Sequence, residues 1–299
     1  MTFDVHFPKL GLEFIVNRIA FSIGNMPIYW YGIFIAAGMM LALAFVFSNN
    51  KRFGINGDKM VDVIFLSTIC AVLCGRAYYV AFAPFEYESF YDMINIRDGG
   101  MAIYGAIIGA FVFGALFCKL RKVKILPMFD LAAMGFLIGQ GIGRWGNFVN
   151  QEAFGSNTTM PWGMISNETT NYLLQNQSVL AAQGVTVDPF MPVHPTFLYE
   201  SIWCLVGFAL LWAFSYRRKF DGEILLAYFT WYGTGRFIIE GFRTDSLMIG
   251  GIRVSQLVAV LMVGVSVILW VMMRRNANKK IKNGEKVLWI DIMKEKGYT

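Results

Sequence analysis

Seven long apolar stretches, separated by polar segments, dominate the pattern of this 299-residue chain. Each stretch is close to the roughly 20 residues that a helix needs to cross a bilayer. Several are rich in glycine, which membrane helices use for close packing. The pattern therefore predicts an all-α integral membrane protein with seven transmembrane helices, over residues 27–48, 60–83, 100–118, 125–144, 196–215, 223–241 and 254–273.

The charges of the polar segments predict the orientation of these helices. Basic residues mark cytoplasmic segments of membrane proteins. Here they follow the first, third, fifth and seventh stretches, as Lys51, Arg52, Lys59, Lys119, Arg121, Lys122, Lys124, Arg217, Arg218, Lys219, Arg274, Arg275, Lys279 and Lys280. The segment 145–195 has no lysine or arginine, and the charged residues of segment 84–99 are Glu86, Glu88, Asp92, Arg97 and Asp98. We therefore expect the N-terminus outside and the C-terminus in the cytoplasm.

This orientation divides the chain into three parts. Residues 1–26 form an extracytoplasmic N-terminal segment, 27–273 the seven-span domain, and 274–299 a basic cytoplasmic tail. The seven-span domain includes one long extracytoplasmic loop, 145–195, and loops of that length are often functional. The tail has two interpretations, a solvated basic segment, which we favour, or a segment lying on an anionic inner leaflet.

Composition narrows the class of protein further. Apolar residues make up 56% of the chain and charged residues 15%, whereas a soluble domain carries about 25% charged residues. Cys70 and Cys74 lie one helical turn apart, but no further ligands follow at the spacing of a metal site, and the only histidines are His6 and His194. We expect no metal, no cofactor and no nucleic-acid partner.

The most unusual polar sequence is GRWGNFVNQEAFG, at residues 143–155. It places Arg144 at the outer end of the fourth predicted helix, where a charged side chain is energetically costly and therefore calls for an explanation. The planar guanidinium of arginine suits phosphate or carboxylate. A snorkelling arginine with an ordinary loop charge at Glu152 is the alternative, and the nearby amides of Asn147 and Asn150 weigh against it.

The sixth predicted helix carries a polar face. Tyr232, Arg236, Glu240 and Arg243 follow at i, i+4, i+8 and i+11, which places them on one side of a helix. Such a stripe must face protein or water rather than lipid. A structural ion pair between Arg236 and Glu240 is the alternative, but two arginines leave a surplus positive charge that suits an anionic ligand such as a phosphodiester.

Three further segments reach the same outer face. HPTFLYE, at 194–200, contains His194, whose ordinary pKa near neutrality suits proton transfer, although a loop histidine is more often structural. Tyr31 and Tyr104 open the first and third predicted helices, where interfacial aromatic residues are common. Without a GxSxG, HExxH or Walker motif, the nucleophile would have to come from a second substrate.

The stretch GRWGNFVNQEAFG closely resembles the signature of the prolipoprotein diacylglyceryl transferases. HPTFLYE at 194–200, YGTGRFIIEGFRTD at 232–245 and YWYG at 29–32 are also similar to that family. The resemblance extends over about residues 27–256. It implies an enzyme of the bacterial cell membrane that acts within the bilayer at its outer leaflet. Its reaction would transfer diacylglyceryl from phosphatidylglycerol to the lipobox cysteine of a prolipoprotein signal peptide, the first step of lipoprotein maturation.

The resemblance also implies roles for individual residues. Arg144 matches the arginine that binds phosphatidylglycerol, and Arg236 matches a second arginine of the reaction. The other positions that match the family's site are Tyr31, Asn147, Glu152, Gly155, Tyr232, Glu240 and Arg243.

One position departs from the family. Many members have histidine where this chain has Tyr104, and that histidine is often proposed as the base for the thiol. A neutral tyrosine, with an ordinary pKa of about 10, is a poor proton acceptor. The base therefore stays open between a tyrosinate at Tyr104, His194, Glu152, Glu240 and the lipid phosphate.

Two other functions fit parts of the pattern. Glycine-rich, interrupted helices with charges at membrane depth also occur in transporters and channels for anionic solutes. A lipid-binding membrane subunit without catalytic activity is a third interpretation. The gathering of polar groups near one face favours the transferase.

Overall fold

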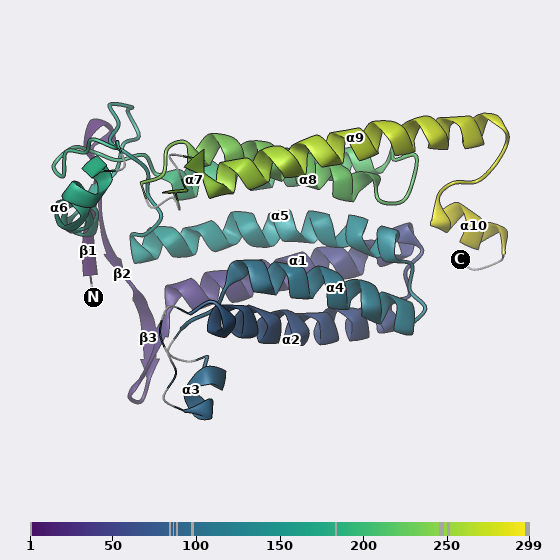
Figure 1. The fold of residues 1–299 in the computed structure, drawn as a ribbon, viewed down its shortest axis with the longest axis horizontal. Helices are drawn as coiled ribbons and strands as arrows, with labels where there is room; N and C mark the ends of the chain where they lie inside the picture. The colour runs from purple at the N-terminus through teal and green to yellow at the C-terminus, as the bar shows by residue number, and fades with distance from the viewer. Residues whose placement is uncertain are drawn as a thin grey trace.

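The computed structural model describes residues 2–83, 85, 87, 89–96, 99–182, 184–244, 248–249 and 252–296, and within them seven long helices form one bundle (Figure 1). These are α1 (Trp30–Asn49), α2 (Gly57–Ala81), α4 (Ile103–Leu120), α5 (Ile125–Asn150), α7 (Thr196–Ser215), α8 (Glu223–Glu240) and α9 (Val254–Lys282). Shorter helices are η1 (Pro8–Leu10), η2 (Asn50–Phe53), α3 (Phe90–Ile94), α6 (Asn167–Ala182) and α10 (Trp289–Glu295).

Six of the long helices of the described chain are long and apolar enough to cross a membrane. The seventh, α8, has 18 residues and includes three charges, Glu223, Arg236 and Glu240. The chain is thus a mostly helical, multi-pass membrane protein. The acidic residues Glu86, Glu88 and Asp98 and the neighbouring Arg97, which helped to predict the orientation, lie outside the described residues.

The helix α5 occupies the centre of the bundle. It packs against α1, α7 and α8, while α2 pairs with α4 and α8 pairs with α9. Its core-facing side chains Leu131, Met134 and Leu137 are fully buried. The helix is six residues longer than predicted, ending at Asn150 rather than at 144. The residues after Arg144 therefore belong to a rigid helix, and the long loop begins at Gln151.

A small cap of strands and one helix covers the end of the bundle where α5 terminates (Figure 1). Strand β1 (Thr2–Phe7) pairs antiparallel with both β2 (Leu12–Asn17) and β5 (Ile165–Ser166). Phe3, Val5 and Phe7 alternate along β1 and pack with residues of α6 such as Leu173. Two hairpins complete the strands, β3 (Ile19–Ile23) with β4 (Met26–Tyr29), and β6 (Met248–Ile249) with β7 (Ile252–Arg253). The predicted 1–26 segment and the 145–195 loop therefore fold together.

The basic segments meet at the opposite end of the bundle (Figure 1). The Arg218 guanidinium donates to the Arg52 carbonyl oxygen over 3.3 Å, and the Lys219 ammonium donates to Asn278 over 2.9 Å. The tail folds back there through Trp289, whose indole N–H donates to the Gly54 carbonyl oxygen over 3.0 Å. The tail is thus docked on the bundle rather than solvated throughout.

Candidate functional site

Three arginines from separate segments converge on the carboxylate of Glu200 at the capped end of the bundle. Arg144 Nε of α5 lies 2.6 Å from Glu200 Oε2. Arg236 Nη1 of α8 lies 3.0 Å from Oε1, and Arg243 Nη1 lies 3.7 Å from the same oxygen. Glu200, in the second turn of α7, is only 6% exposed. From the sequence, Glu200 is noted only as the last residue of HPTFLYE, and its role as the shared counter-ion is not predicted.

A second buried carboxylate balances this cluster only in part. Glu240 Oε2 lies 2.7 Å from Arg236 Nη2, one helical turn away on α8. In the ion pairs between described residues, three arginines against Glu200 and Glu240 leave one surplus positive charge. The side chains of Arg144 and Arg236 are 23% and 22% exposed. A cation surplus that remains accessible is suited to an anionic group such as a phosphodiester.

The prediction that Arg243 lies on the polar face of the sixth helix is wrong. Helix α8 ends at Glu240, and Arg243 follows in a turn. A β-bridge to Gly155 holds this turn, together with a bond from the Ser156 amide to the Phe242 carbonyl oxygen over 2.6 Å. Arg243 therefore reaches Glu200 from the loop side rather than along the helix face.

A strained turn after α5 brings Glu152 back to the helix. Gln151 and Ala153 have φ angles of 53° and 56°, a left-handed conformation that residues other than glycine seldom adopt. The turn lets Glu152 Oε1 accept from Asn147 Nδ2 over 2.9 Å and from Asn150 Nδ2 over 3.3 Å. Asn147 Oδ1 also lies 3.3 Å from Arg144 Nη1. The two amides thus link the carboxylate to the arginine cluster.

Gly155 acts through its backbone. Its N–H donates to the His194 carbonyl oxygen over 2.9 Å. A Cβ at this position would lie 2.7 Å from His194 Cβ and 2.9 Å from the Phe242 carbonyl oxygen. Only glycine permits these three segments to meet so closely.

His194 lies in a half-buried aromatic pocket beside this junction. Its Nδ1 is 2.9 Å from the Tyr199 hydroxyl, which also accepts from Trp162 Nε1 over 2.6 Å. The ring packs against Phe242, with 4.8 Å between ring centroids. Burial lowers the pKa of His194 below its ordinary value of 6.5. The imidazole is therefore neutral near pH 7.

The three predicted tyrosines have different surroundings. Tyr31, in the first turn of α1, packs on Gly146 of α5. Tyr232 stacks on Tyr228 with 5.7 Å between ring centroids and lies one turn before Arg236. Tyr104, in the first turn of α4, is 44% exposed, and its hydroxyl makes no hydrogen bond within the described residues. The predicted residues linked through ion pairs and hydrogen bonds are thus Arg144, Asn147, Glu152, Gly155, Arg236, Glu240, Arg243 and His194.

Comparison with known proteins shows one matching family and several similar proteins. A family model described as prolipoprotein diacylglyceryl transferase matches residues 18–272. The chain is 42% identical over 272 residues to the phosphatidylglycerol–prolipoprotein diacylglyceryl transferase of Limosilactobacillus reuteri (strain DSM 20016), covering 90% of this chain and 94% of the relative. It is 40% identical over 269 residues to phosphatidylglycerol–prolipoprotein diacylglyceryl transferase 1 of Clostridium perfringens (strain 13 / Type A), covering 89% of this chain and 98% of the relative. The corresponding Bacillus cereus (strain G9842) protein is 40% identical over 262 residues, covering 87% and 93%.

Proposed function

The chain belongs to the prolipoprotein diacylglyceryl transferase family, and on this premise we propose that it transfers the diacylglyceryl group of phosphatidylglycerol to the lipobox cysteine of a prolipoprotein signal peptide. The products are a thioether-linked lipid and glycerol phosphate. The chain is a membrane transferase of lipoprotein biosynthesis. The relatives' names support both substrates.

The single observation that carries the mechanism is the arginine cluster around Glu200. In the reaction, the cysteine sulfur attacks the glyceryl carbon, and the bond between that carbon and the phosphate oxygen breaks. The electron pair of that bond leaves with glycerol phosphate, so negative charge grows on the phosphate. Arg144, Arg236 and Arg243 supply fixed positive charge for it, and such preorganised stabilisation is often the largest contribution to catalysis.

The carboxylates hold these arginines in place. Glu200 and Glu240 fix Arg236 between two helices, over 3.0 Å and 2.7 Å. Glu152, through Asn147, steadies the end of α5 beside Arg144. Because the positive groups are positioned before substrate arrives, little reorganisation opposes the reaction. Tyr31, Tyr232 and Gly155 shape the surroundings of the head group.

We assign removal of the thiol proton to His194 rather than to Tyr104. The imidazole is neutral near pH 7, because burial lowers its pKa. In the tautomer that donates Nδ1–H to the Tyr199 hydroxyl, Nε2 offers a lone pair for the proton. The Tyr104 phenol is exposed on α4 and has no hydrogen-bond partner among the described residues. Glu240 is already held by Arg236.

The arrangement in the membrane follows from the same proposal. Seven helices, including α8, cross the bacterial cytoplasmic membrane with the N-terminus outside. The arginine cluster and the strand cap face the outer leaflet, from which phosphatidylglycerol enters. The gathering of basic segments at the opposite end of the bundle supports this orientation. An anion transporter or channel is not favoured, because the family and its relatives are transferases.

The test is a transfer assay with the purified protein, labelled phosphatidylglycerol and a lipobox peptide. We expect the wild-type protein to lipidate the cysteine. Removing a group that stabilises transition-state charge costs about 10²- to 10³-fold in rate, so Arg144→Ala and Arg236→Ala should each lose at least that much. The control Arg275→Ala removes an equivalent charge from an exposed position of α9 and should keep the wild-type rate. A folded wild-type protein that transfers no lipid would refute the proposal.

A further inference from the structure

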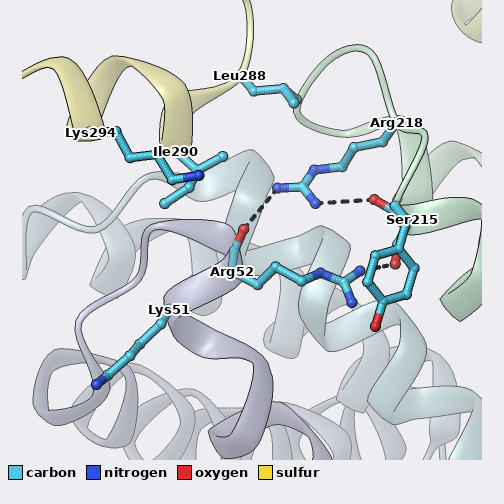
Figure 2. Close-up of a pocket in the computed structure, with 8 residues that line it drawn as sticks. Lys51, Arg52, Ser215, Arg218, Leu288, Ile290 and Lys294 are labelled. Atoms are coloured by element: carbon cyan, nitrogen blue, oxygen red, sulfur yellow. Dashed lines mark hydrogen bonds between the residues drawn. The ribbon is translucent and has the colours of Figure 1, made fainter. Parts of the chain in front are cut away.

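A second basic pocket lies at the end of the bundle opposite the arginine–glutamate cluster (Figure 2). Three segments build it, namely η2, the turn after α7 and the folded-back tail. Its lining residues are Lys51, Arg52, Ser215, Tyr216, Arg218, Leu288, Ile290 and Lys294. The four charged side chains among them are all cationic, and none of them belongs to the proposed catalytic site.

Arg218 is the most enclosed of these cations. Its side chain is 8% exposed, and its guanidinium lies 4.0 Å from the centroid of the Phe53 ring. Nη1 donates to the Ser215 carbonyl oxygen and Nη2 to the Arg52 carbonyl oxygen, each over 3.3 Å. The buried Nε–H has no acceptor within the described residues. Figure 2 shows this guanidinium between the Arg52 backbone and Leu288.

Arg52 repeats this pattern beside it. Its guanidinium lies 3.9 Å from the centroid of the Tyr216 ring and donates through Nη2 to the Ser215 hydroxyl. Its buried Nη1 has no acceptor in the part of the chain that the structure describes. Buried donors without acceptors are rare, because a polar group that loses its water and gains no partner destabilises the folded state. Two of them on neighbouring guanidinium groups indicate that an acceptor from outside the chain completes the pocket.

Three carboxylates lie near Arg218, and two of them accept backbone N–H groups. Asp130, Asp221 and Asp291 offset part of the charge of Arg218. Both oxygens of Asp130 accept backbone N–H groups at the start of α8, over 2.7 Å and 2.8 Å. Asp221 Oδ2 accepts the Trp289 amide over 2.8 Å, whereas its buried Oδ1 has no donor within the described residues. These carboxylates shape the turn and anchor the tail, while Lys51, Arg52 and Lys294 keep the lining positive.

We propose that this pocket binds a phosphate group, held by Arg52 and Arg218 at its base and by Lys294 of α10 at its rim. Phosphate offers several acceptor oxygens, and arginine binds it with directed N–H groups. Basic pockets at the cytoplasmic side of membrane helices take anionic lipid head groups. The same chemistry is available from a free phosphate. Either occupant would join the tail to the bundle, because Lys294 comes from the tail and the arginines do not.

The test uses the full-length protein in a neutral maltoside detergent. The probes are a short-chain phosphatidic acid and inorganic phosphate, and binding is read from the rise in Tm and by native mass spectrometry. A ligand that binds only the folded state stabilises it by RT ln(1 + [L]/Kd), so the rise in Tm grows with ligand concentration and affinity. We expect the Arg52→Gln/Lys294→Gln variant to bind at least tenfold more weakly than the wild-type protein. Lys294→Gln alone, at an exposed position, should also weaken binding and should leave folding intact.

The controls separate this pocket from the catalytic site. Lys279→Gln/Lys282→Gln removes two charges from the exposed end of α9 and should bind the probes as the wild-type protein does. Arg144→Ala should also retain the bound phosphate of this pocket. Tighter binding of phosphatidic acid than of inorganic phosphate would identify a lipid occupant, and equal affinities a free phosphate. Unchanged affinity in both pocket variants, or no binding of either probe, would overturn the proposal.

Discussion

At the scale of single residues, the site depends on one carboxylate that serves three cations. Glu200 is nearly buried, and removing the partner of a buried charge costs far more than removing a surface charge. Its three arginines approach from α5, from α8 and from the turn after α8. Glu200 therefore fixes the distances between the positive groups, and under the proposed function the phosphate would meet a preformed arrangement.

The pH dependence of transfer tests the proton acceptor. Because burial lowers the pKa of His194 below 6.5, the imidazole is neutral at pH 7 and becomes protonated only on further acidification. Transfer should therefore be constant near neutrality and fall below about pH 6.5. A general base contributes about 10²- to 10⁴-fold in rate, so His194→Gln should lose that much and lose the acidic limb.

Tyr104→Phe is the matched variant in this experiment, measured from about pH 5 to about pH 8. It should keep most of the rate and the same acidic limb as the wild-type protein. Loss of transfer in Tyr104→Phe, with normal transfer in His194→Gln, would assign the proton to the phenol instead.

Sequence patterns identify the arginines of the site but not the groups that organise them. Arg144 and Arg236 stand out because a charge in an apolar stretch needs an explanation. Glu200 gives a weaker signal, because a carboxylate near a helix start is also explained by the helix dipole. The left-handed turn at Gln151 and Ala153 leaves no pattern at all, since neither residue favours that conformation. Tertiary contacts impose it.

At the scale of elements, α7 and α8 are joined by a reciprocal pair of tryptophans. The rings of Trp203 and Trp231 stack with 4.5 Å between centroids. Each indole N–H donates to the backbone carbonyl oxygen of the other residue, over 3.0 Å and 2.9 Å. Trp203 lies about one turn after Glu200 on α7 and packs on Gly235, the residue before Arg236 on α8. It therefore sets the spacing of the helices that hold the ion-pair cluster.

Glycine makes room for each tryptophan, which gives a prediction at this scale. A Cβ at Gly207 would overlap the indole of Trp231, so Gly207→Ala must displace the ring. Overpacking of this kind costs about 1–3 kcal/mol. The control Gly264→Ala, inside α9, meets no atom within 4 Å and should stabilise the protein by about 0.5–1 kcal/mol through the higher helix propensity of alanine. Unfolding in titrated SDS measures both, and equal stability of the two variants would contradict the proposed role of the pair.

The sequence predicts the presence of the long helices better than the residues at which they end. Each long helix overlaps a predicted stretch, because apolar length is a strong signal. The apolar pattern ends the fourth helix at residue 144, whereas α5 continues for six more residues, because the polar Asn147 and Asn150 also lie on the helix. The strands of the cap were not predicted. In β1 the apolar Phe3, Val5 and Phe7 alternate with polar residues, which is typical of a strand, but this pattern spans only six residues.

At the scale of the whole molecule, the two ends of the bundle differ in the groups that they carry. The arginine–glutamate cluster and the strand cap occupy one end, and the basic segments with the docked tail occupy the other (Figure 1). Charge can predict the end that faces the cytoplasm. It cannot predict that the tail returns to the bundle, because the contacts of Trp289 with Gly54 and Asp221 join residues far apart in sequence.

The number of crossings depends on α8, which carries three charges and is not among the six helices apolar enough to cross a membrane by length and composition. Its ionic groups are all paired inside the protein, which lowers the cost of placing them at membrane depth. Glu223 lies 3.1 Å from Arg274, and Arg236 pairs with Glu200 and Glu240. We therefore expect α8 to cross the membrane. Between Ala182 and Lys282 the chain would then cross three times, by α7, α8 and α9.

An odd number of crossings places these two positions on opposite sides of the membrane, and an even number places them on the same side. The experiment introduces Ala182→Cys or Lys282→Cys, both at exposed positions, into a variant without the four native cysteines. In intact cells, an impermeant thiol reagent should label the first variant and should reach the second only after permeabilisation. Labelling of both without permeabilisation would mean that α8 does not cross. Labelling of Lys282→Cys in intact cells, with Ala182→Cys labelled only after permeabilisation, would mean that the orientation is opposite to the proposed one. The proposed site would then not face the outer leaflet.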